Sequence, residues 1–438
     1  MEEVINNILA SLYLFMWVAT LIWYQRKSHF FDSGSLIITL YIIYGVFSLF
    51  SINDALFAAT YKPLRLFPYV YLYLMMIIAM SPVIYTHFHT SNKIKDPHTR
   101  IFEIISVIII VCSLILLPNI IANFGNGVVK LFTDVDAGND AYKQQIEEAN
   151  DSGSGISNLP AILYNALSDI AVFLFFYYLT FKKKNLLLII GLAFSIVIGI
   201  LMPIMNGQRG GVIISVLTSI GGYFMFRRYL STKINKALQI TGISFVIIIS
   251  LPVAAITVSR FGKMNAGVTG FLNWYVGQGS LYFNNSALNA GGTRNGDRTM
   301  NIFKRMIDSN TPKNYSERRD KYHNLEIDDN IFSTFVGDFT IDFGPVAAVI
   351  IFIAFNTWVL FQVRPRDGTI KVDQLLLLFF VVCVSVQGGM SLFSYSDTSN
   401  FRIIMFMSLY MYLRYHEVLL DKFPLENKPE YDKPRIMD

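Results

Sequence analysis

Three arginines stand next to long apolar runs, and their side chains are suited to binding phosphate. Arg209 lies in "ILMPIMNGQRGGVIISVL", Arg260 in "AAITVSRFG" and Arg402 in "SDTSNFRIIMFM". A guanidinium is planar and permanently charged, and it can hold a phosphate through two parallel hydrogen bonds. We therefore expect these arginines to bind a lipid-linked phosphate or pyrophosphate. The alternative for Arg209 is a simple anchor whose side chain snorkels to the membrane surface.

A second set of residues could supply a general base. Asp338 and Asp342, in "GDFTIDFG", are four residues apart and would share one helix face. His323 stands in a polar segment nearby in the sequence. The carboxylates could instead pair with arginines or act as favourable charges at a helix N-terminus, and the histidine could simply be solvated.

The composition decides where such residues must sit. Of the 438 residues, 53% are hydrophobic and only 15% are charged, and the mean hydropathy is +0.45. This is the composition of a membrane protein. Because a span needs about 20 mostly apolar residues, about eleven stretches qualify: 4–24, 35–53, 68–86, 102–121, 160–180, 185–205, 210–226, 238–258, 343–363, 373–393 and 399–416. The sequence thus predicts an all-α, polytopic helical bundle.

Alternate loops of this bundle are basic, which predicts its orientation. Short loops rich in Lys and Arg stay in the cytoplasm. They include Arg26 and Lys27, Lys93 to Arg100, Lys182 to Lys184, Arg227 to Lys236, and Arg364 to Lys371. Arg209, Arg260, Arg402, Asp338, Asp342 and His323 then face the exterior, and the other five histidines do not. The net charge of +5 mostly reflects cytoplasmic anchoring and gives no sign of a nucleic-acid partner.

The chain divides into four parts on this basis. We expect eight spans in 1–258, a long exterior loop in 259–333, three spans in 334–417 and a cytoplasmic tail in 418–438. The long loop contains Trp274, Tyr275, Tyr282 and Phe283 among asparagines, a surface suited to carbohydrate or to the aromatic belt of a membrane interface. Metal chemistry is not expected. The acidic "DVD" at 134–136 falls in an acidic exterior loop, where nucleotide sugars are absent, and the "HFH" at 87–89 lacks Cys or carboxylate companions.

The layout, with "NGQRGGVI" at a helix junction and "FSTFVGDFTIDFGPVAAVIIF" after the long loop, resembles that of bacterial O-antigen polymerases, the Wzy-type oligosaccharide repeat-unit polymerases. The resemblance implies a GT-C-like glycosyltransferase of the bacterial inner membrane, acting at the periplasmic face in lipopolysaccharide synthesis. Undecaprenyl-pyrophosphate-linked oligosaccharides would be donor and acceptor, a chain-length regulator protein would be a further partner, and no cofactor would be needed. The resemblance implies that Arg209 binds the pyrophosphate. By analogy with the arginine that often opens the long loop in this family, it implies the same role for Arg260.

Two other functions fit the same residues. One is an O-antigen ligase that transfers the finished glycan to a lipid core, and the other is a flippase or transporter of lipid-linked oligosaccharide. A flippase would place charges along a path inside the membrane, whereas the arginines are expected at one boundary. The sequence therefore favours the polymerase over the flippase.

Overall fold

The structure is a computed structural model of the whole chain, and it is almost entirely helical. It describes residues 2–28, 30–85, 91, 93–97, 100–133, 159–181, 184–206, 208–261, 267–308, 310–312, 317, 321–322, 325–328, 331–365, 368–390 and 397–422.

Nine of the described helices are long and apolar enough to cross a membrane, so the chain is a multi-pass membrane protein. Eight of them precede residue 262: α1 (Glu2–Ser28), α2 (Ser33–Ile52), α3 (Leu66–Tyr85), α4 (Ile101–Thr133), α6 (Leu159–Leu179), α7 (Leu186–Met205), α8 (Arg209–Phe226) and α9 (Thr232–Phe261). The ninth is α13 (Thr334–Gln362), followed by α14 (Val372–Gln387) and α15 (Asp397–Lys422). These eleven helices lie at the eleven predicted positions, although the number that span and the GT-C-like fold remain predictions.

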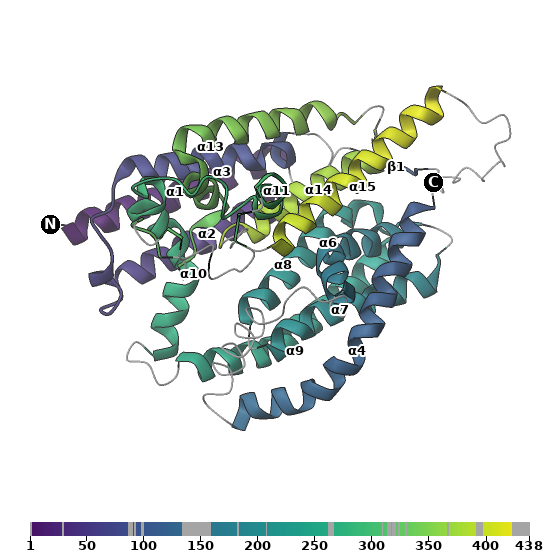
Figure 1. The fold of residues 1–438 in the computed structure, drawn as a ribbon, viewed down its shortest axis with the longest axis horizontal. Coiled ribbons are helices and arrows are strands. Elements are labelled where there is room, and N and C mark those ends of the chain that lie inside the picture. Colours follow the sequence, from purple (N-terminus) through teal and green to yellow (C-terminus); the bar gives the residue numbers. More distant parts are fainter. Residues whose placement is uncertain are drawn as a thin grey trace.

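The helices form two groups joined by a central helix (Figure 1). α1, α2, α3 and α13 pack together, and α4, α6, α7 and α8 form the second group. α14 lies between them, in contact with α2, α3, α8 and α15. Nearly all of its residues are buried. A helix that is apolar on every side belongs in such a position, because it has no polar face to offer to water.

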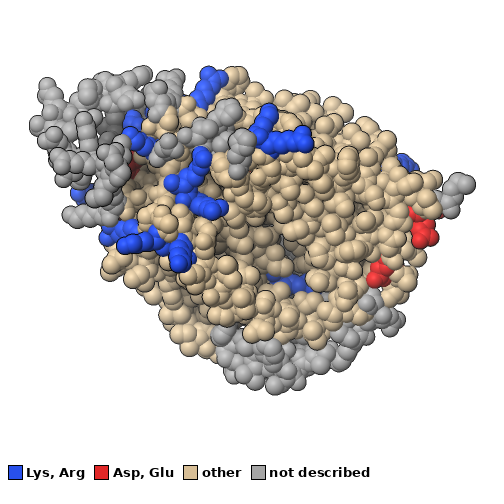
Figure 2. All heavy atoms as spheres, turned by 180° about the vertical axis from the view of Figure 1, so that it is seen from behind, with Lys and Arg blue, Asp and Glu red and all other residues tan. Residues whose placement is uncertain are grey.

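Two short strands show that distant loops meet at one end of the bundle. β1 (Lys93–Lys95) pairs in parallel with β2 (Thr369–Lys371), with Ile94 opposite Ile370. Both strands belong to loops that the sequence places on the same side. On the face in Figure 2, most Lys and Arg side chains gather toward one end and the acidic side chains toward the other. We call the end with β1 and β2 the basic end.

The segment 259–333, expected to be a loop, includes the α-helices α10 (Gly267–Asn285) and α11 (Asn301–Ile307) among its described residues. α10 lies along α2 so closely that a Cβ on Gly277 would be 2.4 Å from the backbone of Phe47. Ser48 completes this crossing by donating to the carbonyl oxygen of Gly277 at 2.6 Å. The glycine is needed for this close approach, so α10 is a packed part of the bundle.

α13 is broken near its start. Gly344 has φ 78° and ψ 162°, and Pro345 follows it. The ten residues before this kink are largely buried, whereas Val346 and Ile350 after it are strongly exposed. The span predicted at 343–363 therefore corresponds to the part of α13 after the kink, which presents apolar side chains to lipid.

The orientation can be tested with single cysteines, because the two native cysteines are buried. Ala59, between α2 and α3, and Ser231, between α8 and α9, are both exposed and lie at opposite ends. We expect an impermeant thiol reagent to label Ala59→Cys in intact spheroplasts and Ser231→Cys only after lysis. The reverse labelling pattern would invert the predicted orientation.

Candidate functional site

Arg209 is the first residue of α8 and is buried, with only 1% of its surface exposed. Its guanidinium carbon lies 3.7 Å from the centre of the Tyr275 ring in α10. A cation above an aromatic face is stabilised by the negative charge of the ring face. If Arg209 were a snorkelling anchor, its guanidinium would lie among lipid headgroups. Because protein encloses the guanidinium instead, a binding site is favoured over an anchor.

Two glycines after Arg209 make this arrangement possible. A Cβ on Gly210 would lie 2.9 Å from the Tyr275 hydroxyl oxygen, and one on Gly211 would lie 3.0 Å from the Pro203 ring in α7. Side chains at these positions would push α8 away from both neighbours. Both close approaches depend on the absence of a side chain. The third glycine near Arg209, Gly207, lies outside the described residues.

Arg402, predicted at the outer boundary, takes part in a polar network between helices. Its Nη1 donates to Gln387 Oε1 at 2.9 Å and lies 3.3 Å from Asp169 Oδ2. Gln387 Nε2 in turn lies 3.0 Å from Asp169 Oδ2 and 3.1 Å from Thr218 Oγ1. Four helices, α6, α8, α14 and α15, are joined by these bonds.

This network lies well inside the bundle. Asp169 and Thr218 are each near the middle of a membrane-length helix, and Gln387 is the last residue of α14. Cavities of about 20 and 30 Å³ lie on two sides of Asp169, and each has room for a water molecule. Ionisable residues inside a membrane bundle commonly mark a functional path. The sequence interpretation missed Asp169, although it is the only charged residue in the stretch 160–180.

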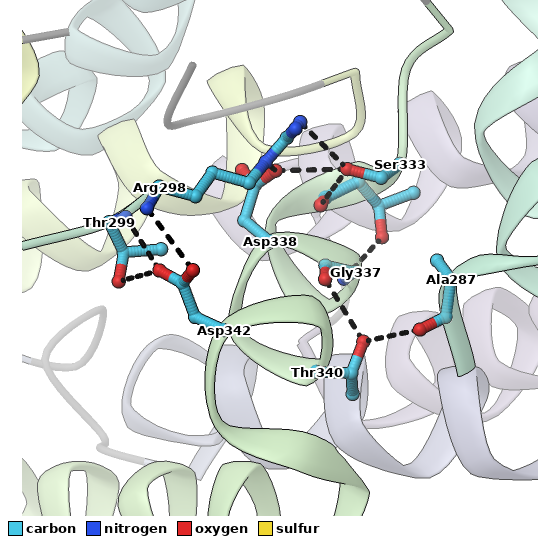
Figure 3. Close-up of polar contacts among 9 residues, drawn as sticks. Ala287, Arg298, Thr299, Ser333, Gly337, Asp338, Thr340 and Asp342 are labelled. Atoms are coloured by element: carbon cyan, nitrogen blue, oxygen red, sulfur yellow. Dashed lines mark hydrogen bonds and ion pairs between the residues drawn. The ribbon is translucent and has the colours of Figure 1, made fainter. Parts of the chain in front are cut away.

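Asp338 and Asp342 share one face of α13, as predicted, and both are bound by the preceding loop (Figure 3). Arg298 Nε donates to Asp338 Oδ1 at 2.7 Å, and Ser333 Oγ donates to the same oxygen at 2.9 Å. Asp342 accepts from the backbone N–H of Arg298 at 3.1 Å and of Thr299 at 2.6 Å. Every one of these side chains is buried. The two carboxylates clamp the loop onto α13.

This clamp bears on the alternatives for the pair. Neither carboxylate is in the first turn of α13, so the interpretation as helix N-terminal charges is wrong. The partner arginine is Arg298, which the sequence interpretation missed. A general base must reach the proton that it removes, and both carboxylates are already engaged and fully buried. The geometry gives them a structural role, and their catalytic role stays a prediction.

A third buried carboxylate, Asp297, organises the outer side of the same loop. It forms ion pairs with Lys304 and, at 2.9 Å, with Lys321, and it accepts a hydrogen bond from Tyr322. Burial alone would raise the pKa of Asp297, but the bonds from Lys304, Tyr322 and Lys321 outweigh it and hold that pKa below its usual value of 3.8. Asp297 is therefore a charged anchor at neutral pH.

Two predicted site residues cannot be placed. The side chain of Arg260, near the end of α9, and the whole of His323 lie outside the described residues. Within the part of the chain that is described, no group of three or more His, Cys, Asp or Glu side chains could hold a metal ion. Cys112 and Cys383 are buried and unpaired, as expected of small apolar residues.

Comparison with known proteins gave no match to a family model, a curated protein or a solved structure.

The Asp169–Arg402 pair can be tested through stability. Removing one partner of a buried ion pair leaves an uncompensated charge, whereas replacing both with apolar residues is often neutral. We expect Asp169→Leu to lower the free energy of unfolding by about 3–5 kcal/mol, and Asp169→Leu with Arg402→Met to recover most of it. Melting of the detergent-solubilised protein gives the measurement. Equal losses in the single and double variants would contradict the coupling.

Asp297 makes a pH-dependent contribution to stability. Because its folded pKa is lowered, the contribution is complete above the unfolded value of about 4 and is lost as the pH falls through the lower folded value. Asp297→Asn should cost about 1–3 kcal/mol at pH 7 and should flatten the decline in melting temperature below pH 4. A variant whose melting temperature falls with acid as steeply as that of the native protein would refute this role.

Proposed function

We propose that the chain is a membrane glycosyltransferase that polymerises lipid-linked oligosaccharide repeat units of a bacterial surface polysaccharide. The observation that carries the proposal is the burial of Arg209 against Tyr275 at the end of the bundle opposite the basic end. If the basic end is cytoplasmic, Arg209 faces the periplasmic side of the inner membrane. There it could hold the pyrophosphate of an undecaprenyl-linked donor, as the resemblance to O-antigen polymerases implies.

The reaction sets clear requirements for the site. A hydroxyl oxygen of the acceptor glycan forms a bond to the anomeric carbon of the donor, and the bond from that carbon to the pyrophosphate oxygen breaks. The hydroxyl proton passes to a base, and the pyrophosphate leaves with the charge that an arginine can neutralise. Arg209 is suited to that second task, because Tyr275 fixes its guanidinium plane. His323 remains the proposed base, and Arg260 a further phosphate ligand. Arg402 is bound to Asp169 and Gln387, so it would have to leave these partners to act as the third phosphate ligand.

A second function is favoured by a specific observation. The Asp169–Arg402 pair lies between helices inside the bundle, which is where a flippase or transporter of lipid-linked oligosaccharide would carry charges. The same ion pair fixes α15 against α6, which a polymerase would also need. An O-antigen ligase would use the same Arg209 chemistry, so it remains an alternative. The enclosed arginine at the boundary suits the stabilisation of a leaving group, which favours the polymerase over the flippase. The resemblance to O-antigen polymerases favours the polymerase over the ligase.

A deletion strain separates these functions. Single capped repeat units would support the polymerase, free polymer the ligase, and internally trapped lipid-linked units the flippase. Either of the last two results would replace the proposed function.

Arg209→Lys tests the binding of phosphate by Arg209, because lysine keeps the charge but lacks the planar guanidinium that makes two parallel hydrogen bonds. If each charge-assisted bond to the leaving group contributes about 1.5–3 kcal/mol, polymer synthesis should fall about tenfold to a hundredfold at an unchanged protein level. Tyr275→Phe is the matched control, since it keeps the ring under the cation and should retain activity. Polymer ladders on gels give the measurement, and a native ladder from Arg209→Lys would return this residue to an anchoring role.

A further inference from the structure

A groove at the end opposite the basic end has the shape and chemistry of a lipid headgroup site. It has a volume of about 970 Å³ and lies between the start of α3, the end of α10 and the part of α13 just after the kink. We call it the Arg65 groove, and the residues that matter for its chemistry are Lys62, Arg65, Phe67, Val346 and Ile350. None of them belongs to the site described above.

One wall of the Arg65 groove is apolar and faces the lipid. Phe67, Val346 and Ile350 expose 68%, 74% and 63% of their surfaces. The kink at Gly344 brings the exposed part of α13 to this position. Exposed large apolar side chains on a membrane helix contact hydrocarbon, so a lipid chain can lie along this wall.

The other wall carries positive charge on a fixed backbone. Asn284 accepts from the Arg65 N–H at 2.9 Å and donates to the Arg65 carbonyl oxygen at 2.8 Å. Asn285 makes the same pair of bonds to the backbone of Lys62. In the structure as described, the Arg65 side chain is exposed and no hydrogen bond or ion pair engages it. A cation is thus presented at the membrane boundary, directly above the apolar wall.

A second, smaller cavity continues from the Arg65 groove away from the membrane. It has a volume of about 340 Å³, and we call it the Trp274 cavity. Lys62, Asn285 and Glu326 line both spaces, and the 3.0 Å ion pair between Lys62 and Glu326 lies where they meet. Trp274, Tyr61 and Asp328 add aromatic and polar groups. Such a combination suits a hydroxyl-rich group, whose C–H faces stack on rings while its hydroxyls find polar partners.

We propose that the Arg65 groove and the Trp274 cavity together bind one lipid, with its hydrocarbon chain on the apolar wall, its phosphate at Arg65 and Lys62, and a hydroxyl-rich headgroup in the Trp274 cavity. The exposed Arg65 guanidinium can bind the phosphate directly, and Lys62 would exchange its ion pair with Glu326 for a bond to the phosphate. The inference rests on the proposed function for the identity of the headgroup, because a sugar-bearing lipid phosphate is the substrate class proposed there. Neither Arg209 nor Tyr275 lines the groove or the cavity, so this is a separate subsite.

Binding without turnover tests the inference. The purified full-length protein is placed in neutral-lipid nanodiscs and titrated with undecaprenyl phosphate, phosphatidylglycerol or inorganic phosphate, and bound lipid is counted by native mass spectrometry. We expect undecaprenyl phosphate to bind, with affinity lowered about tenfold to a hundredfold in Arg65→Gln. Val346→Trp should also lower it by filling the apolar side. Arg227→Gln, an exposed arginine at the other end, is the matched control and should bind like the native protein.

Several outcomes would overturn the inference. Native affinity in both Arg65→Gln and Val346→Trp would show that the lipid sits elsewhere. Binding of phosphatidylglycerol that Arg65→Gln leaves unchanged, or an equal loss in Arg227→Gln, would indicate a general layer of anionic lipid. Saturation by inorganic phosphate alone would reduce the groove to an anion site. Because Arg209→Lys is scored by polymer synthesis and these variants by binding, failure of this inference is distinguishable from failure of the proposed function.

Discussion

A charge enclosed among apolar helices must find a compensating group, and this constraint organises the parts of the bundle that carry chemistry. A bare ion in a medium of low dielectric constant is so costly that it would be neutralised or expelled. Three of the enclosed charges therefore join elements that are far apart in the sequence. Arg209 ties α8 to α10 through Tyr275, Asp169 ties α6 to α15 through Arg402, and Asp338 ties α13 to the preceding loop through Arg298.

These interactions define two regions of the molecule with different properties. The Arg298 clamp and the ion pairs of Asp297 make a rigid cap at the end opposite the basic end. Under the proposed function this rigidity would matter, because groups that bind a leaving group act best when they need not reorganise. The Asp169 network lies deeper in the bundle and has small cavities beside it. The proposed glycosyltransferase would need both features, because its reacting groups would stay fixed while a long substrate moved past them.

The sequence predicted the helices well because their signal is local. A run of about 20 apolar residues is visible without any knowledge of neighbours, and α6, α7 and α8 each begin within a residue of the expected position. The partners of the charges could not be predicted in the same way, because they depend on packing between distant segments. Arg298 lies 40 residues from Asp338, and Gln387 lies 218 residues from Asp169. α10 was missed as a helix for a related reason, since its glycines and asparagines look like a loop until Gly277 is seen against α2.

The break in α13 separates two mechanical tasks that a straight helix would couple. From Pro345 to Gln362 the helix is about 27 Å long, close to the roughly 30 Å thickness of the hydrocarbon layer. A bilayer that is thicker or thinner than this length is accommodated by a change in helix tilt. Gly344 supplies the pivot for such a change. The part of α13 after Gly344 can then tilt while Asp338 keeps its contacts with Arg298. A change in membrane thickness would therefore leave the cap in place.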